Sequence, residues 1–314
     1  MADKELYKKI CSQYSDIPLF LQDWWLDAVC NEWDVAIAKS GEQIAGIWPY
    51  QIEQKMGVNI LRTPKLTPYQ GPFIFYPADV KESNKDGFEH EIVTELLRQI
   101  PKYKVWNLAL QPGFKQAGIL KSKGLQTQVQ QTFLIDLARD EQTIFSNLKE
   151  NLRRNIRAGE KGITITNDPE CVELLFQFQK QTLTNKGAGQ AYTLQDMQRV
   201  MDACYKHEKG ALWVAKAEEK ILAAVWNVWD KNCGYYLMGA QNPEIENNNK
   251  AMSVLLWHSI KQARERGNTT FDLEGSMDQG VERFFRNFGG KRELYMVLLK
   301  NDSLLWQLKE KIKK

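Results

Sequence analysis

The sequence predicts an α+β protein with two tandem domains of one kind, each with a mixed, largely antiparallel sheet and flanking helices. The main observation is an internal similarity between VAIAKSGEQIAG at 35–46 and LWVAKAEEKILA at 212–223. In both segments an apolar strand ends in Ala-Lys, a short polar turn contains Glu, and an Ile opens a second apolar strand, which is typical of a β-hairpin. A chance likeness between two unrelated hairpins is the alternative.

The elements after each hairpin favour duplication over chance. The first hairpin continues through IWPYQIEQ, and a Pro-rich stretch, the helical pattern FEHEIVTELLRQI and the strand KVWNLAL follow. The second continues through AAVWNVWD and GYYLMGA, and the helical pattern AMSVLLWHSIKQARERG precedes the strand TTFDLEG. The order hairpin, strand, helix, strand therefore occurs twice, without the long βαβ alternation of a doubly wound sheet. A change from strand to helix near QQTFLIDLARDEQTIF predicts domains at 1–140 and 141–314.

Composition indicates a packed globular protein and gives little support for a nucleic-acid or metal partner. The chain has 314 residues, 43% of them hydrophobic, and 42 basic against 39 acidic residues, a net charge of +3. The five cysteines form no CxxC pair, and His90, His207 and His258 lie in separate helical patterns. We therefore predict neither a disulfide framework nor a metal site.

The ends of the chain predict a cytoplasmic protein without a transmembrane segment. MADKELYKKICSQ carries charges where a signal peptide has an apolar run, and no stretch approaches the roughly 20 apolar residues of a spanning helix. The amphipathic tail SLLWQLKEKIKK places Leu305, Leu308 and Ile312 on one side and lysines on the other. It could contact an anionic membrane peripherally, or it could be a terminal helix docked on the core.

The stretch FDLEGSMDQGVERFFRNFGG at 271–290 concentrates reactive groups. It begins as a strand in which alternation would place Asp272 and Glu274 on one face, and it breaks at Gly275. Either carboxylate could take the proton from an attacking ammonium, and Arg286 could stabilise the oxyanion of acyl transfer. These three are the predicted catalytic residues. The alternative is an ordinary strand–loop–helix connection with solvated acids.

Two segments are candidates for binding phosphate groups. QNPEIENNNK runs into a helix, so Asn247, Asn248, Asn249 and Lys250 are predicted to bind the co-substrate at a helix N-terminus, with Asn249 as the N-cap. A plain Asn-rich turn is the alternative, because no P-loop fingerprint is present.

The second segment is the helical pattern NLKENLRRNIRAGEKG, in which Leu148, Leu152 and Ile156 form an apolar stripe. A parallel basic stripe is predicted to hold phosphates, since arginine pairs with them through two hydrogen bonds. A solvated basic face is the alternative. The basic residues are Lys149, Arg153, Arg154, Arg157 and Lys161.

The order of these pieces resembles a known family. The second half is similar to a GNAT-type acyltransferase domain, with a hairpin, the strand GYYLMGA, QNPEIENNNK at the pantetheine-loop position, a helix and TTFDLEG. The duplication, NLRRNIRAGEKGITI, GVERFFRNFGG and the early segment PLFLQDWWLDAV resemble more specifically the Fem family of aminoacyltransferases and its GNAT-like relatives. The resemblance covers nearly the whole chain. It implies two GNAT-like domains that transfer an activated acyl or aminoacyl group to an amine.

The chain departs from these patterns at two points. Asn247 to Lys250 stand where CoA-using enzymes have Q/R-x-x-G-x-G/A, and Phe285 stands where Fem proteins often have a lysine. We therefore predict an N-acyltransferase or aminoacyltransferase with acyl-CoA or aminoacyl-tRNA as co-substrate, no metal, and an amine acceptor such as a lipid-linked cell-envelope precursor. The alternative is a catalytically inactive GNAT-like module that binds RNA or anionic lipid through the basic helix at 147–161.

Overall fold

The computed structural model describes residues 2–245, 249–275 and 277–307, and these fall into two compact units. The first unit runs to Gln130 and takes up the chain again from Leu294, and the second spans Gln131–Glu293. The division differs from the predicted boundary near residue 140 because the last strand returns to the first unit. There its residues Val297–Asn301 pair with 105–109 in antiparallel fashion. The predicted fold class, two tandem α+β domains with mixed sheets, is confirmed.

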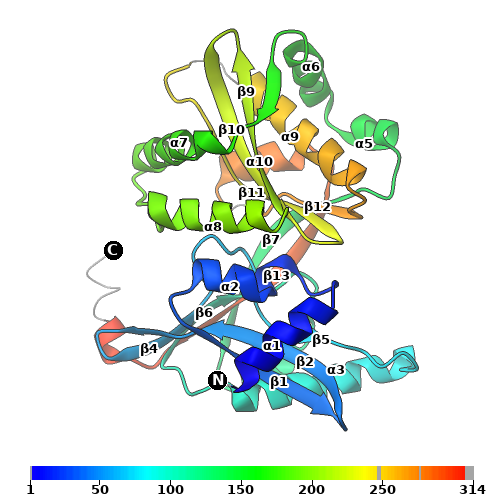
Figure 1. Cartoon of the computed structure of the whole chain (residues 1–314), viewed down its shortest axis with the longest axis vertical. Helices are drawn as coiled ribbons and strands as arrows, with labels where there is room; N and C mark the ends of the chain where they lie inside the picture. Colours follow the sequence, from blue (N-terminus) through cyan, green and yellow to red (C-terminus); the bar gives the residue numbers. More distant parts are fainter. Residues whose placement is uncertain (1, 246–248, 276, 308–314) are drawn as a thin grey trace. The chain divides into compact units, whose positions relative to one another are not determined.

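The first unit has two sets of strands, β1-β2-β5 and β3-β4-β6-β13, and α3 packs against β1 and β2 (Figure 1). The contact with α3 is close, because a side chain at Gly46 would overlap Ile92 of that helix. Its elements are α1 (Ala2–Gln13), η1 (Leu19–Leu21), α2 (Asp23–Val29), β1 (Trp33–Ser40), β2 (Gln43–Gln51), β3 (Glu53–Lys55), β4 (Val58–Arg62), β5 (Phe73–Ile74), α3 (Glu82–Gln99), β6 (Val105–Ala109) and α4 (Ala117–Ser122), with parts of β7 (Gln126–Asp136) and β13 (Lys291–Asn301).

The second unit is built on the strand order β7-β12-β11-β10-β9-β8. Successive residues of β10 serve opposite faces: Val225 lies in the core with α9, whereas Trp226 lies beside Gly210 and Cys204 of α8. Its elements are α5 (Glu141–Asn147), α6 (Glu150–Gly159), β8 (Thr164–Asn167), η2 (Pro169–Cys171), α7 (Val172–Asn185), α8 (Leu194–Lys206), β9 (Gly210–Ala217), β10 (Lys220–Trp229), β11 (Cys233–Gln241), α9 (Asn249–Glu265), β12 (Thr270–Asp272) and α10 (Gln279–Arg286).

The two predicted hairpins form, and they share the same register. In the first, Lys39 faces Ile44 and Ala38 faces Gly46, so Ala45 is an extra residue. In the second, Lys216 faces Ile221 and Ala215 faces Ala223, with Leu222 as the extra residue. The first turn residue is left-handed in both, Gly41 with φ 62° and Glu218 with φ 53°. An identical bulge and turn in both copies supports duplication.

Each unit also has one parallel strand pair joined by a helix. β4 pairs with β6 across the connection that contains α3, and β11 pairs with β12 across α9. These pairs match the strand–helix–strand order that the sequence predicts in both halves. The last residue pair of each parallel pairing defines equivalent positions in the two units. Arg62 faces Asn107 at the last β4–β6 pair, and Tyr235 faces Asp272 at the last β11–β12 pair.

Helix α9 contains a histidine that makes the second unit sensitive to acid. The His258 ring meets the Trp213 ring at 4.5 Å, and neither His258 Nε2 nor Trp213 Nε1 has a hydrogen-bond partner within the described ranges. Burial, with smaller effects from Lys261 and Arg266, lowers the pKa of His258 to about 4. Since the unfolded chain binds this proton at higher pH, the contribution to stability falls as pH drops from about 6.5 towards 4.

We expect His258→Phe to remove that acid sensitivity while keeping a ring against Trp213. Between pH 7 and pH 4.5 the variant should lose about 1–2 kcal/mol less stability than the wild type, after allowance for partial exposure. Urea unfolding at both values measures the difference. His90→Phe, on an exposed position of α3, is the control. Equal acid sensitivity in wild type and His258→Phe would rule out this role.

Candidate active site

The candidate site lies where β11 and β12 part. Their parallel pairing ends at Tyr235 and Asp272, yet β11 continues to Gln241. Beyond the last pair, the Gly239 carbonyl of β11 accepts a hydrogen bond from Gln179 Nε2 of α7 at 2.7 Å. The gap between the two strands is therefore bordered by β11, by α7 and by the residues that follow Asp272.

Asp272 and Glu274 both lie at this gap, but they do not share a strand face as predicted. The strand ends at Asp272, and the chain then turns so that the Glu274 N–H donates to Asp272 Oδ1 at 2.7 Å. The Thr132 hydroxyl also donates to Asp272 Oδ1. Asp272 is 2% exposed and holds the turn together through these bonds, so its carboxylate is already engaged by the protein.

Glu274 is held in an unusual backbone conformation by the residue after it. Its φ is 54°, a left-handed value that costs a non-glycine residue about 1–3 kcal/mol and persists only where the surroundings impose it. Gly275 follows with φ 47° and lies against β7, where an added Cβ would overlap the Gln131 carbonyl oxygen and come within 2.7 Å of Thr132 Cα. Because Gly275 has no side chain, the backbone can pass directly against β7, and this position of the backbone sets the conformation of Glu274.

The Glu274 carboxyl group is half-buried and incompletely paired. Its Oε1 is inaccessible to water and has no hydrogen-bond donor in the described part of the chain. Burial, and secondly the charge of Asp272, raise the pKa of Glu274 well above its usual range. Tyr236 lies near enough that the charge of Glu274 adds to burial in raising the pKa of its phenol. A desolvated carboxyl with a raised pKa is a recognised mark of a catalytic base.

Aromatic rings line the β11 side of this carboxyl group. Tyr236 meets Phe285 of α10 edge to face at 5.4 Å. Its hydroxyl occupies the space above Gly239, where a Cβ would lie only 2.6 Å away. Phe285, the position of the lysine in the predicted family pattern, thus packs against Tyr236 as part of the core.

Arg286, the predicted oxyanion donor, is exposed on α10. It pairs with Glu282 at 4.0 Å on the same helix, so the predicted role of Arg286 as an oxyanion donor stays a prediction. Arg292 instead binds Glu282 at 2.8 Å and donates to the Gln131 side chain. It thereby connects α10 to the part of β7 that Gly275 crosses.

The basic stripe differs from the predicted continuous helix. The chain forms α5 and α6 with extended residues between them, and Lys149 is the N-cap of α6 with ψ 145° rather than a member of the helical row. Arg153 Nη1 donates to the carbonyl oxygens of Ser146 and Leu148, so this guanidinium caps the end of α5. The apolar stripe is placed as predicted, since Leu148, Leu152 and Ile156 are buried in the core.

Four of the five predicted cations, all except Lys149, line one open groove of about 440 Å³ on α6. Its walls are Glu150, Arg153, Arg154, Arg157, Ala158 and Lys161, so four cations face one acid. Arg157 also lies over the Phe145 ring at 5.3 Å. This density of positive charge fits a ligand with several phosphate groups.

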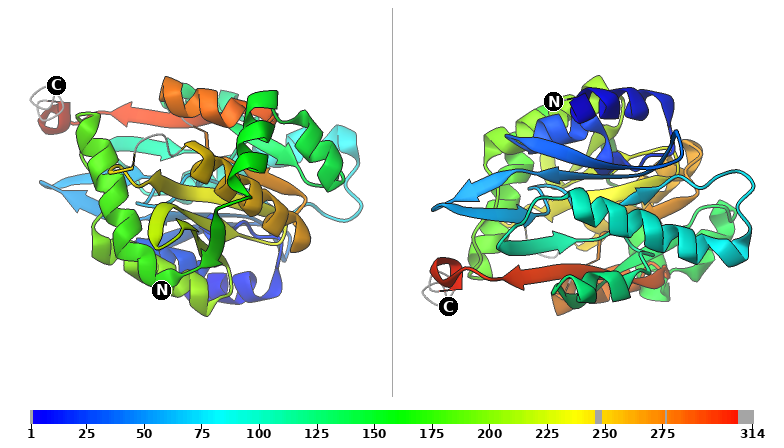
Figure 2. Two further views of the ribbon diagram at one scale, coloured as in Figure 1. Left: turned by 90° about the horizontal axis from the view of Figure 1, so that it is seen from above. Right: turned by 90° about the horizontal axis from the view of Figure 1, so that it is seen from below.

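The α6 groove adjoins the start of α9. α6 packs against α9, as Figure 1 and the left view of Figure 2 show. The contact is close, because a Cβ at Gly159 would be 2.5 Å from Val254 and 3.5 Å from Lys250 Cβ. Of the four predicted co-substrate residues, Asn247 and Asn248 and the side chain of Asn249 lie outside the described residues. Lys250 is exposed on the first turn of α9, and Lys161 follows α6.

The equivalent gap in the first unit is closed by its own chain. Two residues after the last β4–β6 pair stands Ala109, the counterpart of Glu274. The Ala109 N–H donates to Thr63 Oγ1 at 2.8 Å, and its carbonyl accepts from the Gln70 N–H at 2.8 Å. Gln70 then forms a parallel bridge with Leu110. The first unit therefore has the methyl group of Ala109 at this position, and its backbone is engaged by hydrogen bonds. Of the two equivalent positions, only the one in the second unit carries a carboxylate, that of Glu274.

Two further findings concern cofactors and membranes. The residues described by the structure contain no group of three or more His, Cys, Asp or Glu side chains able to hold a metal ion. No helix in those ranges is long and apolar enough to cross a bilayer. The amphipathic tail, predicted as a peripheral membrane contact, lies outside the described residues from Leu308 onward, and Leu305 is 56% exposed.

Comparison with known protein families finds one similarity, and it lies within the second unit. Residues 146–286 match the family described as the acetyltransferase (GNAT) domain. A search of curated protein sequences finds no match. The end of the β11–β12 pairing and the Glu274 carboxyl group both lie within the segment that matches this domain family.

Solved structures with the same fold extend over most of the chain. The crystal structure of FemX matches with a TM-score of 0.65 at 12% identity, covering 97% of this chain and 98% of that one. The C-terminal domain of a putative lysylphosphatidylglycerol synthetase from Agrobacterium fabrum matches with 0.53 at 14% identity, covering 96% and 92%. A tandem GNAT protein from the clavulanic acid biosynthesis pathway matches with 0.51 at 8% identity, covering 88% and 86%. These likenesses show that the chain has a tandem GNAT-like fold similar to that of FemX, which is the fold that its sequence predicts.

Proposed function

We propose that this protein is an amide-forming N-acyltransferase or aminoacyltransferase, with Glu274 of the second unit as its general base. The observation that carries the proposal is the buried, incompletely paired Glu274 carboxyl at the β11–β12 gap of a GNAT domain. Such a group is costly to keep unless it acts on a ligand, since an unsatisfied buried acceptor costs about 1–3 kcal/mol.

The reaction begins with an amine that binds as its ammonium form beside Glu274. The ammonium supplies the positive charge that the aromatic surroundings lack, and it thereby stabilises the ionised form of Glu274, which the ligand-free protein disfavours. The ammonium then transfers one proton to this carboxylate. The freed nitrogen lone pair attacks the carbonyl carbon of the activated acyl group, and an oxyanion forms. When the intermediate collapses, the thiol or hydroxyl of the donor leaves with a proton from the nitrogen, and an amide bond remains. Arg286 stays a prediction as the oxyanion donor.

The donor is proposed to bind through phosphate groups along the α6 groove and the start of α9. Arg154, Arg157 and Lys161 are the cations with side chains available for this role, because Arg153 caps α5. Lys250 lies next to the α6 end of the groove and would extend the path. Acyl-CoA and aminoacyl-tRNA both carry phosphates, and a Fem-like tandem fold favours testing both. The acceptor is proposed to be an amine on a cell-envelope precursor.

We expect the double variant Arg154→Ala/Arg157→Ala to bind the donor more weakly. Affinity for bulk tRNA should fall about tenfold or more at low salt, and the slope of log affinity against log salt should flatten by about 2, because two fewer counterions are released. Fluorescence anisotropy with labelled tRNA, and with labelled CoA in parallel, measures both quantities. A matched control, Lys180→Ala/Lys206→Ala, removes the same charge from exposed positions of α7 and α8.

The same measurement separates the proposal from its alternative. A non-enzymatic module binding RNA or anionic lipid through α6 would show the salt-dependent loss, yet transfer nothing in an assay with charged donor and amine. Native mass spectrometry of protein purified from its own host identifies which phosphate-bearing molecule is retained. If the double variant and the control bind tRNA and CoA equally, the groove is a solvated surface.

A further inference from the structure

A β-bulge in β11 sets the direction of Tyr236. Two neighbouring residues of β10 face Met238 and Tyr236, so Leu237 between them is an extra residue of β11. Residues three apart lie on opposite faces of a regular strand, but the extra residue places Tyr236 and Gly239 on the same face. Bulges re-aim side chains in this way, and they are frequent next to active sites.

The Tyr236 side chain lies directly against Gly239. A Cβ at Gly239 would be only 2.6 Å from the Tyr236 hydroxyl oxygen and 2.9 Å from Cε2 of its ring, so glycine alone leaves room for this side chain. Phe285 of α10 packs edge to face on the same ring at 5.4 Å. These two contacts fix where the hydroxyl lies.

The hydroxyl lies over the part of β11 that has no β12 partner. The parallel pairing ends at Tyr235 and Asp272, and Tyr236 and Gly239 both follow this last pair on β11. Glu274 is the second residue after Asp272. The Tyr236 hydroxyl and the Glu274 carboxyl group therefore border the same gap, one from β11 and one from the chain that leaves β12.

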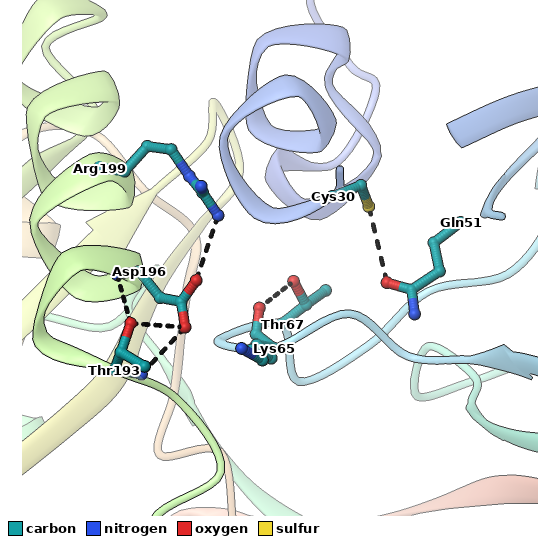
Figure 3. A network of polar contacts seen from close by, with 7 residues as sticks. All are labelled: Cys30, Gln51, Lys65, Thr67, Thr193, Asp196 and Arg199. Atoms are coloured by element: carbon teal, nitrogen blue, oxygen red, sulfur yellow. Dashed lines mark hydrogen bonds and ion pairs between the residues drawn. The ribbon is translucent and has the colours of Figure 1, made fainter. Parts of the chain in front are cut away.

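α7 holds this part of β11 in place without β12. Gln179 Nε2 of α7 donates to the Gly239 carbonyl at 2.7 Å, and α7 packs against both β11 and α8. The first turn of α8 is itself fixed, because Thr193 and Asp196 form a reciprocal capping box and Arg199 pairs with Asp196 at 3.3 Å (Figure 3). The backbone beneath the hydroxyl is thus anchored.

The Tyr236 hydroxyl is a neutral donor that is available to a ligand. It donates no hydrogen bond to any residue that the structure describes. Burial, and secondly the charge of Glu274, raise the pKa of Tyr236, so the hydroxyl keeps its proton at neutral pH. A developing oxyanion is stabilised by fixed donors of this kind.

We propose that Tyr236 is a catalytic residue whose hydroxyl donates a hydrogen bond to the carbonyl oxygen of the acyl donor as that oxygen becomes an oxyanion. The inference rests on the proposed amide-forming function and adds a second catalytic group to Glu274. As the bond from nitrogen to carbon forms, one electron pair of the C=O bond moves to the oxygen. The hydroxyl donates to this oxygen and keeps its own proton. The pair then returns to form C=O, and the sulfur or oxygen of the donor leaves.

Tyr236→Phe removes the hydroxyl and keeps the ring against Phe285. We expect the single-turnover rate of transfer to fall about 10²–10³-fold, the usual loss when one oxyanion donor is removed, with unchanged donor affinity. The factor should be the same between about pH 6 and pH 9, and the acidic limb set by Glu274 should not move. Tyr205→Phe, whose hydroxyl accepts from the Leu212 N–H in the same unit, should lose stability but keep the wild-type rate.

Gly239→Ala tests the position of the hydroxyl. The added methyl group takes the space that the hydroxyl occupies, so the rate of folded protein should fall at least about tenfold. When Tyr236→Phe is already present, Gly239→Ala should cost less than about threefold more, because the displaced group is gone. Urea unfolding gives the folded fraction of each variant.

The same assays distinguish the possible failures. A wild-type rate in Tyr236→Phe, beside slow transfer by Glu274→Gln, would overturn this inference and leave the proposed function standing. Slow transfer by Arg286→Ala would then assign the oxyanion to Arg286. A slow Tyr236→Phe whose acidic limb has shifted would show that Tyr236 acts by placing Glu274, against a role at the oxyanion. No transfer by the wild type from acyl-CoA or aminoacyl-tRNA would overturn both proposals.

Discussion

Replacing Glu274 with Gln is expected to lower the rate of acyl transfer by about 10²–10⁴-fold, with little change in donor affinity. The amide keeps the size of the side chain but cannot accept the amine proton. The measurement is a single-turnover transfer assay with a matched donor and acceptor. Glu219→Gln, in the exposed β9–β10 turn, removes the same charge from the same unit and should retain full activity.

The same variant should be more stable than the wild type at neutral and alkaline pH. Because the folded protein raises the pKa of Glu274, the native state holds this proton while the unfolded chain has released it. Stability therefore falls as pH rises above the unfolded pKa of about 4.3, at up to about 1.4 kcal/mol per pH unit until the raised folded pKa is passed. Glutamine does not titrate in this range, so the Glu274→Gln variant does not lose this contribution to its free energy of unfolding. Urea unfolding from pH 4 to pH 8 should show the two proteins diverging.

Asp272→Asn separates the roles of the two acids. The amide oxygen still accepts from the Glu274 N–H, but the negative charge that helps to raise the pKa of Glu274 is gone. We expect the acidic limb of the pH–rate profile, where the rate rises as Glu274 loses its proton, to move to lower pH, with a smaller loss of rate than in Glu274→Gln. Full activity in both variants at every pH would show that residues 271–290 are only a structural connection.

Replacing Gly275 with Ala is expected to destabilise the second unit by about 3 kcal/mol or more, because two effects add. A Cβ would overlap the Gln131 carbonyl oxygen of β7, and the residue would adopt a left-handed φ of 47°. Relief requires the backbone to move away from β7, which displaces Glu274, so residual folded protein should also transfer acyl groups slowly. Urea unfolding and the transfer assay measure the two consequences.

Gly162→Ala is the matched control for this prediction. Gly162 is an exposed glycine of the same unit with nothing within 4 Å of a built Cβ and no left-handed φ. Its replacement should change stability by less than about 0.5 kcal/mol or raise it slightly. Equal, small effects in both variants would show that the chain at Gly275 can shift freely, and the account of how Glu274 is directed would fail.

Local patterns predicted the elements of the fold, because the spacing of apolar residues differs between a strand and a helix and can be read within a single element. The shared Ala-Lys turn at 35–46 and 212–223 proved to be two hairpins with the same bulge, since strand registers follow from nearby residues. The apolar stripe of Leu148, Leu152 and Ile156 is buried as predicted. The interruption at Lys149 was missed, because the extended residues between α5 and α6 lack a Gly or Pro that would mark them.

The catalytic roles of the candidate site residues stay a prediction, and the structure changes how two of these residues are arranged. Strand alternation placed Asp272 and Glu274 together on one face, but the strand ends at Asp272, and the turn engages one acid while leaving the other incompletely paired. Gly275 was the available signal, since a glycine directly after a strand often marks a close backbone approach. Tyr236 carries no local signature. It reaches the site only because β11 extends past the end of its pairing with β12.

The sequence by itself determined the duplicated α+β architecture, the Fem-like GNAT resemblance and the stretch that bears the carboxylates, because these depend on composition, period and order along the chain. Only the tertiary structure decided which half closes this position with hydrogen bonds and which acid has a carboxyl oxygen without a hydrogen-bond donor among the described residues. Ala109 and Gln70 close the first gap through hydrogen bonds between segments distant in sequence, whereas Glu274 is isolated by burial and by the crossing at Gly275. Burial and pairing are properties of three-dimensional neighbours, and no local pattern specifies them.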